Sequence, residues 1–386
     1  MSGFAWTPSL STCYYNGGGR PPLRQREQVM ARSTKSRFME AAFVAHFAAL
    51  MLLPGCVTAV APSAAQDTQS AAPDPQLSFT EWTKACEAKD RRFCTTSKEG
   101  RVGSGQVVVA AEIVERPGAT RVLRVTLPLG MSIQPGQRVI LDQDQPMRAP
   151  YVDCSSAGCS ATYETSQDFI DQLSRGNGLA VQGINGAGKP VSLVVPLANF
   201  ARALNGPSSA TRQPRTNPAG TLTGKEKLFY SPWTKFCLKG DGANAKNVCF
   251  TGKDARIESG PVAAAVLIEP VEDPKKILRV TLPLNISIGQ GTNINIDQGQ
   301  ALNAPFVICF QNGCMADYEA SNELINRLRT GRDFLVQGTN SDGRPLRWSL
   351  PLADFAKAHD GPAIDPKVFQ AQQKKLQEDL AGRARR

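Results

Sequence analysis

The sequence predicts a mainly β protein with two tandem antiparallel domains of the β-sandwich or barrel type, each carrying one or two short helices and two disulfides. Three observations support this prediction. The chain repeats itself at a long period, each copy contains short β-branched runs between turn residues, and each copy holds four cysteines at matched positions. The composition agrees, because 33 glycines and 27 prolines favour many turns over long helical bundles.

The duplication appears as a constant shift in numbering. With an offset of 155, residues 94–207 align to residues 249–362 without a gap, and we count 49 identities among these 114 positions. The run LRVTLPL at 123–129, for example, recurs at 278–284. Solenoid repeats have periods of about 20 to 50 residues, so this longer period indicates two copies of a whole domain.

The repeat and the composition of its flanks set the boundaries of the segments. The stretch between the copies is polar and contains Pro214 and Pro218, as a flexible linker would. We divide the chain into an upstream extension 1–29, a signal peptide 30–65, a flexible leader 66–78, the first domain 79–207, a linker 208–227, the second domain 228–362 and a basic C-terminal tail 363–386.

Short strands account for most of each domain. In the first copy, β-branched runs at 106–113 and 121–127 flank Arg116-Pro117-Gly118, a pattern typical of a hairpin. In the second copy, runs at 262–268 and 277–282 flank a corresponding turn segment. Further strands of the first copy are expected at 138–142, 150–154, 159–164, 179–183 and 191–195.

One amphipathic helix interrupts the strands of each copy. In the segment 166–176, Ser166 is suited to cap the helix, Phe169, Ile170 and Leu173 share one face, and Gly176 ends it. The segment 321–331 repeats this pattern. We therefore expect an equivalent helix in both domains.

Residues 30–65 have the pattern of a secretory signal peptide: a basic start, an apolar middle and a run of small residues. The apolar stretch 41–53 has 13 residues, whereas a membrane-spanning helix needs about 20. We expect an exported protein.

Two ways of processing this signal stay open. Leu53-Pro54-Gly55-Cys56 resembles a lipobox, in which Cys56 would receive a lipid anchor. Cleavage after Ala59 or Ala65 would instead release a soluble protein. Contact with a membrane is expected only through this anchor or through the basic tail.

The four cysteines of each copy suggest disulfides, since an exported chain reaches an oxidising compartment. Four cysteines allow three pairings in each domain, and the sequence alone does not choose among them. We favour pairs that close short loops: Cys86–Cys94, Cys154–Cys159, Cys237–Cys249 and Cys309–Cys314. With only His46 and His359 as histidines, we expect no metal site and no cofactor.

The net charge of +10 comes mostly from outside the two domains. Residues 77–207 carry 14 basic and 12 acidic side chains, and residues 228–362 carry 14 of each. Two nearly neutral domains do not favour nucleic acid as a partner.

The acids shared by both copies are Asp142 and Asp297, and Glu164 and Glu319. A carboxylate pair of this kind could hydrolyse glycosides. The favoured interpretation is structural, because the aspartates end a strand at a turn and the glutamates precede a helix cap. We expect no catalytic residues and no enzymatic activity.

The tail contains a helix signal at Asp365-Pro366, followed by Phe369 and several lysines and arginines. A basic helix of this kind could lie on an anionic surface. The favoured expectation is a frayed, solvated terminus.

The order of motifs resembles the invasion-associated locus B (IalB) family. The motifs are W-x3-C, LRVTLPLG, APYVDC, AGC, VQG and PLANFARAL, and the resemblance covers 79–207 and 230–362. It implies an exported periplasmic or outer-membrane-associated β protein, linked in some pathogens to entry into host cells.

We therefore expect a non-enzymatic binding or structural protein of the envelope. Its partner would be an envelope or host protein or glycan, and two modules could raise avidity if both bind together. Two alternatives are a cell-wall glycan-acting enzyme that uses the paired carboxylates and a periplasmic inhibitor or chaperone-like module.

Overall fold

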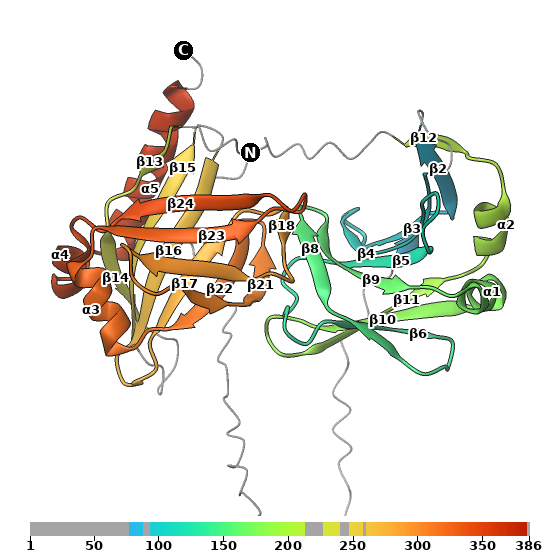
Figure 1. Ribbon diagram of the computed structural model, residues 1–386, viewed down its shortest axis with the longest axis horizontal. Coiled ribbons are helices and arrows are strands. Elements are labelled where there is room, and N and C mark those ends of the chain that lie inside the picture. The colour runs from blue at the N-terminus through green and yellow to red at the C-terminus, as the bar shows by residue number, and fades with distance from the viewer. Residues whose placement is uncertain (1–76, 88–92, 213–226, 240–246, 258–259, 384–386) are drawn as a thin grey trace, which may run out of the picture. The chain divides into compact units, whose positions relative to one another are not determined.

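The computed structural model describes residues 77–87, 93–212, 227–239, 247–257 and 260–383, all within one compact unit (Figure 1). The segment 30–65, expected to be a signal peptide, and its Cys56 lie outside these residues. Among the helices that the model describes, none is long and apolar enough to cross a bilayer.

Each half consists of a large and a small sheet, and the strands pair antiparallel, as predicted, except for one parallel edge pair in the first half. In the large sheet of the first half, the strand order is β12-β2-β3-β4-β5-β9-β8-β18, and β1 also pairs with β3. The strands are β1 (Ser78–Phe79), β2 (Thr83–Glu87), β3 (Cys94–Arg101), β4 (Val107–Glu115), β5 (Val122–Leu127), β8 (Tyr151–Ser155), β9 (Gly158–Glu164), β12 (Ala210–Arg212) and β18 (Ile286–Ser287).

The small sheet and two helices complete the first half. The sheet has the order β11-β10-β6-β7. These elements are β6 (Gln137–Leu141), β7 (Met147–Ala149), β10 (Gly178–Ile184), β11 (Pro190–Pro196), α1 (Gln167–Arg175) and α2 (Phe200–Asn205). Alternate residues in the middle of β4, namely Val109, Ala111 and Ile113, are fully buried, so the large sheet turns one face to the core.

The second half repeats this arrangement. Its large sheet has the order β13-β15-β16-β17-β22-β21, with β14 also paired to β15, and its small sheet has the order β20-β19-β23-β24. The elements are β13 (Phe229–Tyr230), β14 (Thr234–Leu238), β15 (Val248–Ile257), β16 (Gly260–Pro270), β17 (Ile277–Leu282), β19 (Thr292–Ile296), β20 (Leu302–Ala304), β21 (Phe306–Phe310), β22 (Gly313–Glu319), β23 (Asp333–Thr339), β24 (Pro345–Pro351), α3 (Asn322–Thr330), α4 (Phe355–Asp360) and α5 (Pro366–Arg383).

The predicted amphipathic helices are α1 and α3, and both begin at a serine cap. The hydroxyl of Ser166 accepts a hydrogen bond from the Phe169 amide at 3.1 Å, and that of Ser321 accepts one from the Leu324 amide at 3.2 Å. The cap satisfies an amide that has no partner within the helix.

The structure joins the cysteines in the pairings favoured from the sequence. The disulfides are Cys86–Cys94, Cys154–Cys159, Cys237–Cys249 and Cys309–Cys314. In every pair the two cysteines lie directly opposite each other on neighbouring antiparallel strands. Each disulfide therefore ties together two strands of a large sheet.

The strand registers correct the gap-free alignment of the two copies. Arg101 lies opposite Val107, whereas its counterpart Arg256 lies opposite Pro261, so this hairpin is one residue shorter in the second half. The next hairpin, between β16 and β17, is one residue longer than its counterpart and restores the offset.

These two changes shift β16 by one position relative to the constant offset. Glu112 lies opposite Arg124, and Val266 lies opposite the corresponding Arg279. Glu112 therefore corresponds to Val266 and not to Leu267. Because side chains alternate between the faces of a sheet, a shift of one residue assigns every position of the strand to the opposite face.

The segment expected to be a linker contributes a strand to the first half. In β12, Ala210 lies opposite Ala85 in a parallel pair with β2. Just before it, the Ser209 amide donates a hydrogen bond to the Lys84 carbonyl at 2.9 Å. Residues 213–226 lie outside the described residues.

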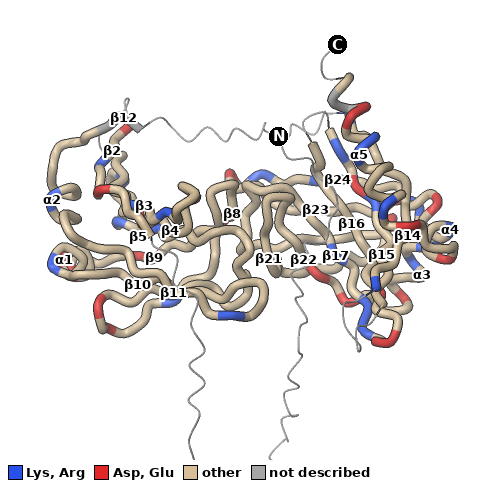
Figure 2. The backbone as a smooth tube through the Cα atoms, turned by 180° about the vertical axis from the view of Figure 1, so that it is seen from behind, with Lys and Arg blue, Asp and Glu red and all other residues tan. Residues whose placement is uncertain are grey.

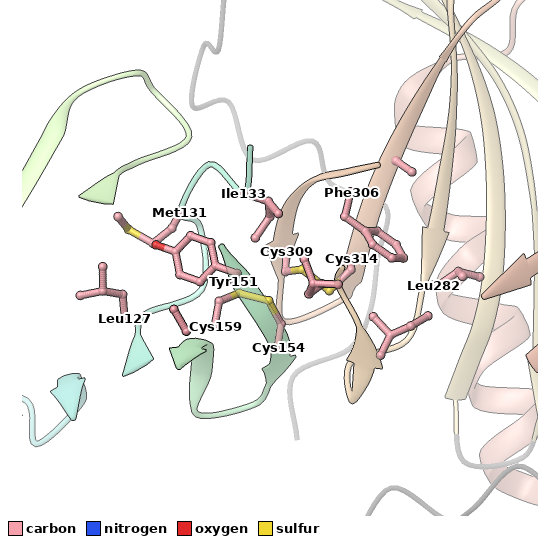
Figure 3. Packing of buried hydrophobic residues seen from close by; sticks show 14 of the residues in the cluster. Leu127, Met131, Ile133, Tyr151, Cys154, Cys159, Leu282, Phe306, Cys309 and Cys314 are labelled. Atoms are coloured by element: carbon pink, nitrogen blue, oxygen red, sulfur yellow. A yellow bond between two sulfur atoms is a disulfide. The ribbon is translucent and has the colours of Figure 1, made fainter. Parts of the chain in front are cut away.

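The two halves meet where β18 of the second half pairs with β8 of the first. Around this junction, buried residues from both halves form one continuous cluster (Figure 3). The halves therefore share a core across the junction, which two independent modules on a linker would not.

Candidate functional site

The paired aspartates act as clamps for the backbone at the ends of strands. The Asp142 carboxylate accepts hydrogen bonds from the amides of Asn177 and Gly178, both at 3.0 Å. The Asp297 carboxylate does the same with the next strand of its own half, at 3.0 and 2.9 Å. Both aspartates have a positive φ, 48° and 52°. Their position is thus explained by local structure.

The amide hydrogen bonds to Asp297 have an electrostatic consequence. The amides of Asp333 and Arg332 hold the pKa of the Asp297 carboxyl below its ordinary value. A carboxylate stabilised in its charged form is a poor proton donor at neutral pH. This geometry does not favour Asp297 as a general acid.

The paired glutamates do not join the aspartates in one site. Glu164 ends β9 and Glu319 ends β22, both in large sheets and both exposed, whereas Asp142 follows β6 of a small sheet. These four carboxylates therefore do not form the facing pair that glycoside hydrolysis requires.

His359 forms a structural contact in the second half. Its Nε2 lies 3.1 Å from Glu269, and its ring stacks on Phe355 with centroids 5.6 Å apart. Glu269 also pairs with Lys276 at 2.9 Å. Burial alone would raise the pKa of Glu269, but hydrogen bonds from Lys276 and His359 outweigh it and hold this pKa below its ordinary value.

Three cysteine sulfurs converge at the junction between the halves. The Sγ atoms of Cys154, Cys159 and Cys309 all lie within 4.8 Å of one another, and all three residues are buried. Each of these sulfurs belongs to a disulfide. A disulfide sulfur has no thiolate to offer a metal ion, so the cluster serves packing in this state.

A polar surface lies on the large sheet of the first half, on the side opposite the core. Its residues share a face because they lie opposite one another on adjacent strands. We call it the outer face, and it consists of Ser97, Glu99, Arg101, Glu112, Arg124, Asp153 and Thr162.

Ion pairs organise the outer face. Arg124 Nη2 donates to both oxygens of Asp153 at 2.7 and 2.8 Å, and Arg101 donates to Glu99 at 2.5 Å. The side chains of Arg101 and Glu99 are 41% and 39% exposed, so solvent reaches this pair. Acidic and basic residues are interspersed along the described chain (Figure 2). The face offers donors and acceptors together without a strong net charge.

Part of the corresponding face of the second half is apolar and covered by α5, whereas its Arg279–Asp317 ion pair stays 31% and 22% exposed. Phe236, Phe250 and Val266 replace Ala85, Thr95 and Glu112 of the first half. The Phe236 ring stacks between Phe250 at 5.2 Å and Phe369 of α5 at 4.6 Å. Figure 1 shows α5 beside β14 and β15. The space left under the helix measures about 10 Å³, barely enough for one water.

The helix α5 corrects the expectation of a frayed tail. Phe369 and Gln373 are each only 6% exposed, so one side of α5 is buried against the sheet. Gln373 Oε1 accepts a hydrogen bond from Arg256 at 2.6 Å, and Arg256 is also paired with Asp254. The sequence carries a signal for this packing in Phe250 and Val266, which stand where the first half has Thr95 and Glu112, but the constant offset concealed the second of these replacements.

The chain is similar to a known protein family and to a solved structure. The family model described as "Invasion associated locus B (IalB) protein" matches residues 82–208 and again residues 233–363. Among solved structures, a crystal structure of invasion associated protein B from Bartonella henselae is similar, with 20% identity, coverage of 33% of this chain and 93% of that chain, and a TM-score of 0.30. No curated protein matches the chain. Since the family model matches most of the chain in two successive copies, the protein belongs to the IalB family and contains its domain twice.

Proposed function

We propose that this protein is an exported, non-enzymatic envelope protein that binds a protein partner through the outer face of its first half. The observation that carries the proposal is the contrast between the two large sheets. The first presents the Glu99–Arg101 pair to solvent, whereas α5 buries the matching Asp254–Arg256 pair of the second. This end of the sheet is therefore accessible to a partner in the first half and not in the second.

The chemistry of the outer face favours a protein partner. Two arginines and three acids alternate on it, which suits the mixed polar surface of another protein. Its residues include no aromatic ring on which a sugar could stack, so a glycan fits less well. An inhibitor or chaperone-like role would be a special case in which the partner is an enzyme or an unfolded chain.

A capture experiment with matched variants tests this proposal. The whole chain is immobilised and exposed to envelope and host-membrane extracts. We expect Arg124→Ala and Thr162→Arg to lose bound proteins that the unmodified chain retains. The control is Arg279→Ala, because Arg279 forms the equivalent ion pair with Asp317 at 2.7 Å in the second half.

The outcomes separate the alternatives. Equal loss with Arg279→Ala, or full retention with both first-half variants, would contradict the assignment of binding to the outer face. Loss of binding after enzymatic removal of sugars from the extract would replace the protein partner with a glycan.

Export and anchoring form a separate part of the proposal. The signal-like segment 30–65 supports export, and Cys56 supports a lipid anchor. The N-terminus of the mature protein, identified by mass spectrometry, decides between lipidated Cys56 and a soluble chain that starts after Ala59 or Ala65. Incorporation of labelled fatty acid that persists in Cys56→Ala would exclude the anchor at this residue.

A further inference from the structure

The junction between the halves contains the same contact twice, with the roles of the halves exchanged. The Gly130 amide donates a hydrogen bond to the Cys309 carbonyl at 2.7 Å, and the Asn285 amide donates one to the Cys154 carbonyl, also at 2.7 Å. Gly130 and Asn285 correspond to each other in the repeat, as do Cys154 and Cys309. Both donors have a positive φ, 91° and 65°, which glycine and asparagine adopt most readily.

A second pair of contacts follows the same rule. The Ile133 amide donates to the Val307 carbonyl at 2.9 Å, and the Ile288 amide donates to the Val152 carbonyl at 2.9 Å. The residues between them also pair reciprocally: Ser132 with Ile308, and Ser287 with Asp153. Reciprocal contacts of this kind define a two-fold, isologous interface, the type by which identical subunits associate.

The side chains at the junction are alike on both sides. Each half contributes two aliphatic or thioether side chains, one aromatic ring and one disulfide, and none of these residues is more than 5% exposed (Figure 3). They are Met131, Ile133, Tyr151 and Cys154–Cys159 in the first half, and Ile286, Ile288, Phe306 and Cys309–Cys314 in the second. A face that fits a near copy of itself is close to fitting an identical one.

One polar contact distinguishes the two sides. Gln134 Nε2 donates a hydrogen bond to the Phe306 carbonyl at 2.7 Å, whereas the residue that corresponds to Gln134 is Gly289, which has no side chain. A pair of first-half faces would make this hydrogen bond twice. A pair of second-half faces would not make it.

We propose that this junction surface is a self-association surface whose partner is a second copy of this chain. We define it as residues 130–133 and 152–154 in the first half and 285–288 and 307–309 in the second. Within one chain the two surfaces cover each other, and the tether keeps their effective concentration high. When one of them is damaged, the other is freed and binds the same surface of another chain.

The test measures the mass of whole-chain variants by light scattering at increasing concentration. Ile133→Lys places a charge in the first-half surface, so we expect dimers that form through two second-half surfaces. Ile288→Lys should form dimers through two first-half surfaces. The second dimer should be the tighter one, with a lower dissociation constant, because it makes the Gln134 hydrogen bond twice.

Two controls make the test specific. The double variant Ile133→Lys/Ile288→Lys lacks both surfaces and should remain a monomer. Val194→Lys alters a residue that is 54% exposed outside the junction, and it should behave like the unmodified chain at each concentration. Dimers of the double variant equal to those of the single variants would overturn the proposal.

The proposal is also overturned if both single variants stay monomeric at the highest concentration reached while circular dichroism and disulfide mapping show them folded. Should a lysine variant fail to fold, Ile133→Ser and Ile288→Ser perturb the same positions more mildly and decide the question by the same measurement.

Discussion

The two halves of this protein carry the same acid–base pair at the same place in their large sheets, yet in opposite environments. Glu99 and Arg101 of the first half are 39% and 41% exposed, whereas Asp254 and Arg256 of the second half are 2% and 3% exposed. The residue types and their spacing are conserved between the copies. What differs is α5, which covers the pair of the second copy.

The comparison shows how an added helix changes the contribution of conserved residues to stability. An exposed ion pair contributes about 0 to 1 kcal/mol, because water solvates both charges when they separate. A buried charge that loses its partner costs about 3 to 5 kcal/mol. The second half has thus converted a surface pair into a structural one, and the first half keeps its pair accessible.

Removing the acid of each pair gives the largest expected difference. Asp254→Ala leaves the buried Arg256 with Gln373 as its remaining hydrogen-bond acceptor, so we expect the free energy of unfolding to fall by about 3 to 5 kcal/mol. Glu99→Ala should lower it by at most about 1 kcal/mol. Urea denaturation of both variants measures the difference, and equal losses would show that α5 does not bury the pair in solution.

The second prediction weakens the contact between α5 and the large sheet of the second half. Phe369→Ala removes the ring that stacks on Phe236, and we expect a loss of about 3 kcal/mol, at the low end for a buried phenylalanine because α5 lies at the surface. The neighbouring Val368 is 48% exposed, so Val368→Ala should change stability by less than about 0.5 kcal/mol.

Limited proteolysis provides an independent measurement of the same variants. Cleavage within α5 should become faster in Phe369→Ala and stay unchanged in Val368→Ala. Unchanged cleavage in both would indicate that the ring does not hold the helix in place.

The third prediction concerns the pH dependence of the contact between Glu269 and His359. The pKa of Glu269 is lowered in the folded state, so its charged form stabilises the fold above the unfolded pKa of about 4.3, and this contribution is lost as the pH falls through the folded value. Glu269→Gln should therefore cost about 1 to 3 kcal/mol at pH 7. The difference from the unmodified protein should shrink when urea denaturation is repeated below pH 4, and a constant difference would contradict the role of the charge.

The smallest effect is expected where the halves agree. Asp142→Ala and Asp297→Ala each remove a backbone clamp and place alanine at positive φ, so each should lower the free energy of unfolding, and both by the same amount. Asp142→Asn should be milder, because asparagine tolerates this conformation. A loss of hydrolysis of cell-wall glycan in a folded Asp142→Asn variant would instead support the enzymatic alternative.

Local patterns predicted much of this fold. The serine-capped helices, the short strands and the duplication depend on residues close together in the chain, and the cysteine pairs were favoured because each closes a short loop. The outer face and its covered counterpart could not be predicted in this way. Two compensating one-residue changes in the hairpins leave the sequence alignment gap-free. This alignment matches Glu112 with the core residue Leu267 instead of its structural counterpart Val266.

The sequence by itself determined the family, the β architecture and the two copies, because alternation, turn residues and motif order are properties of short stretches. Only the tertiary structure decided which copy keeps its polar face open and how the halves join. Both depend on contacts between segments far apart in the chain: α5 against β14 and β15, and β18 against β8. The burial of one conserved ion pair and the exposure of the other follow from those contacts and not from the residues of the pair.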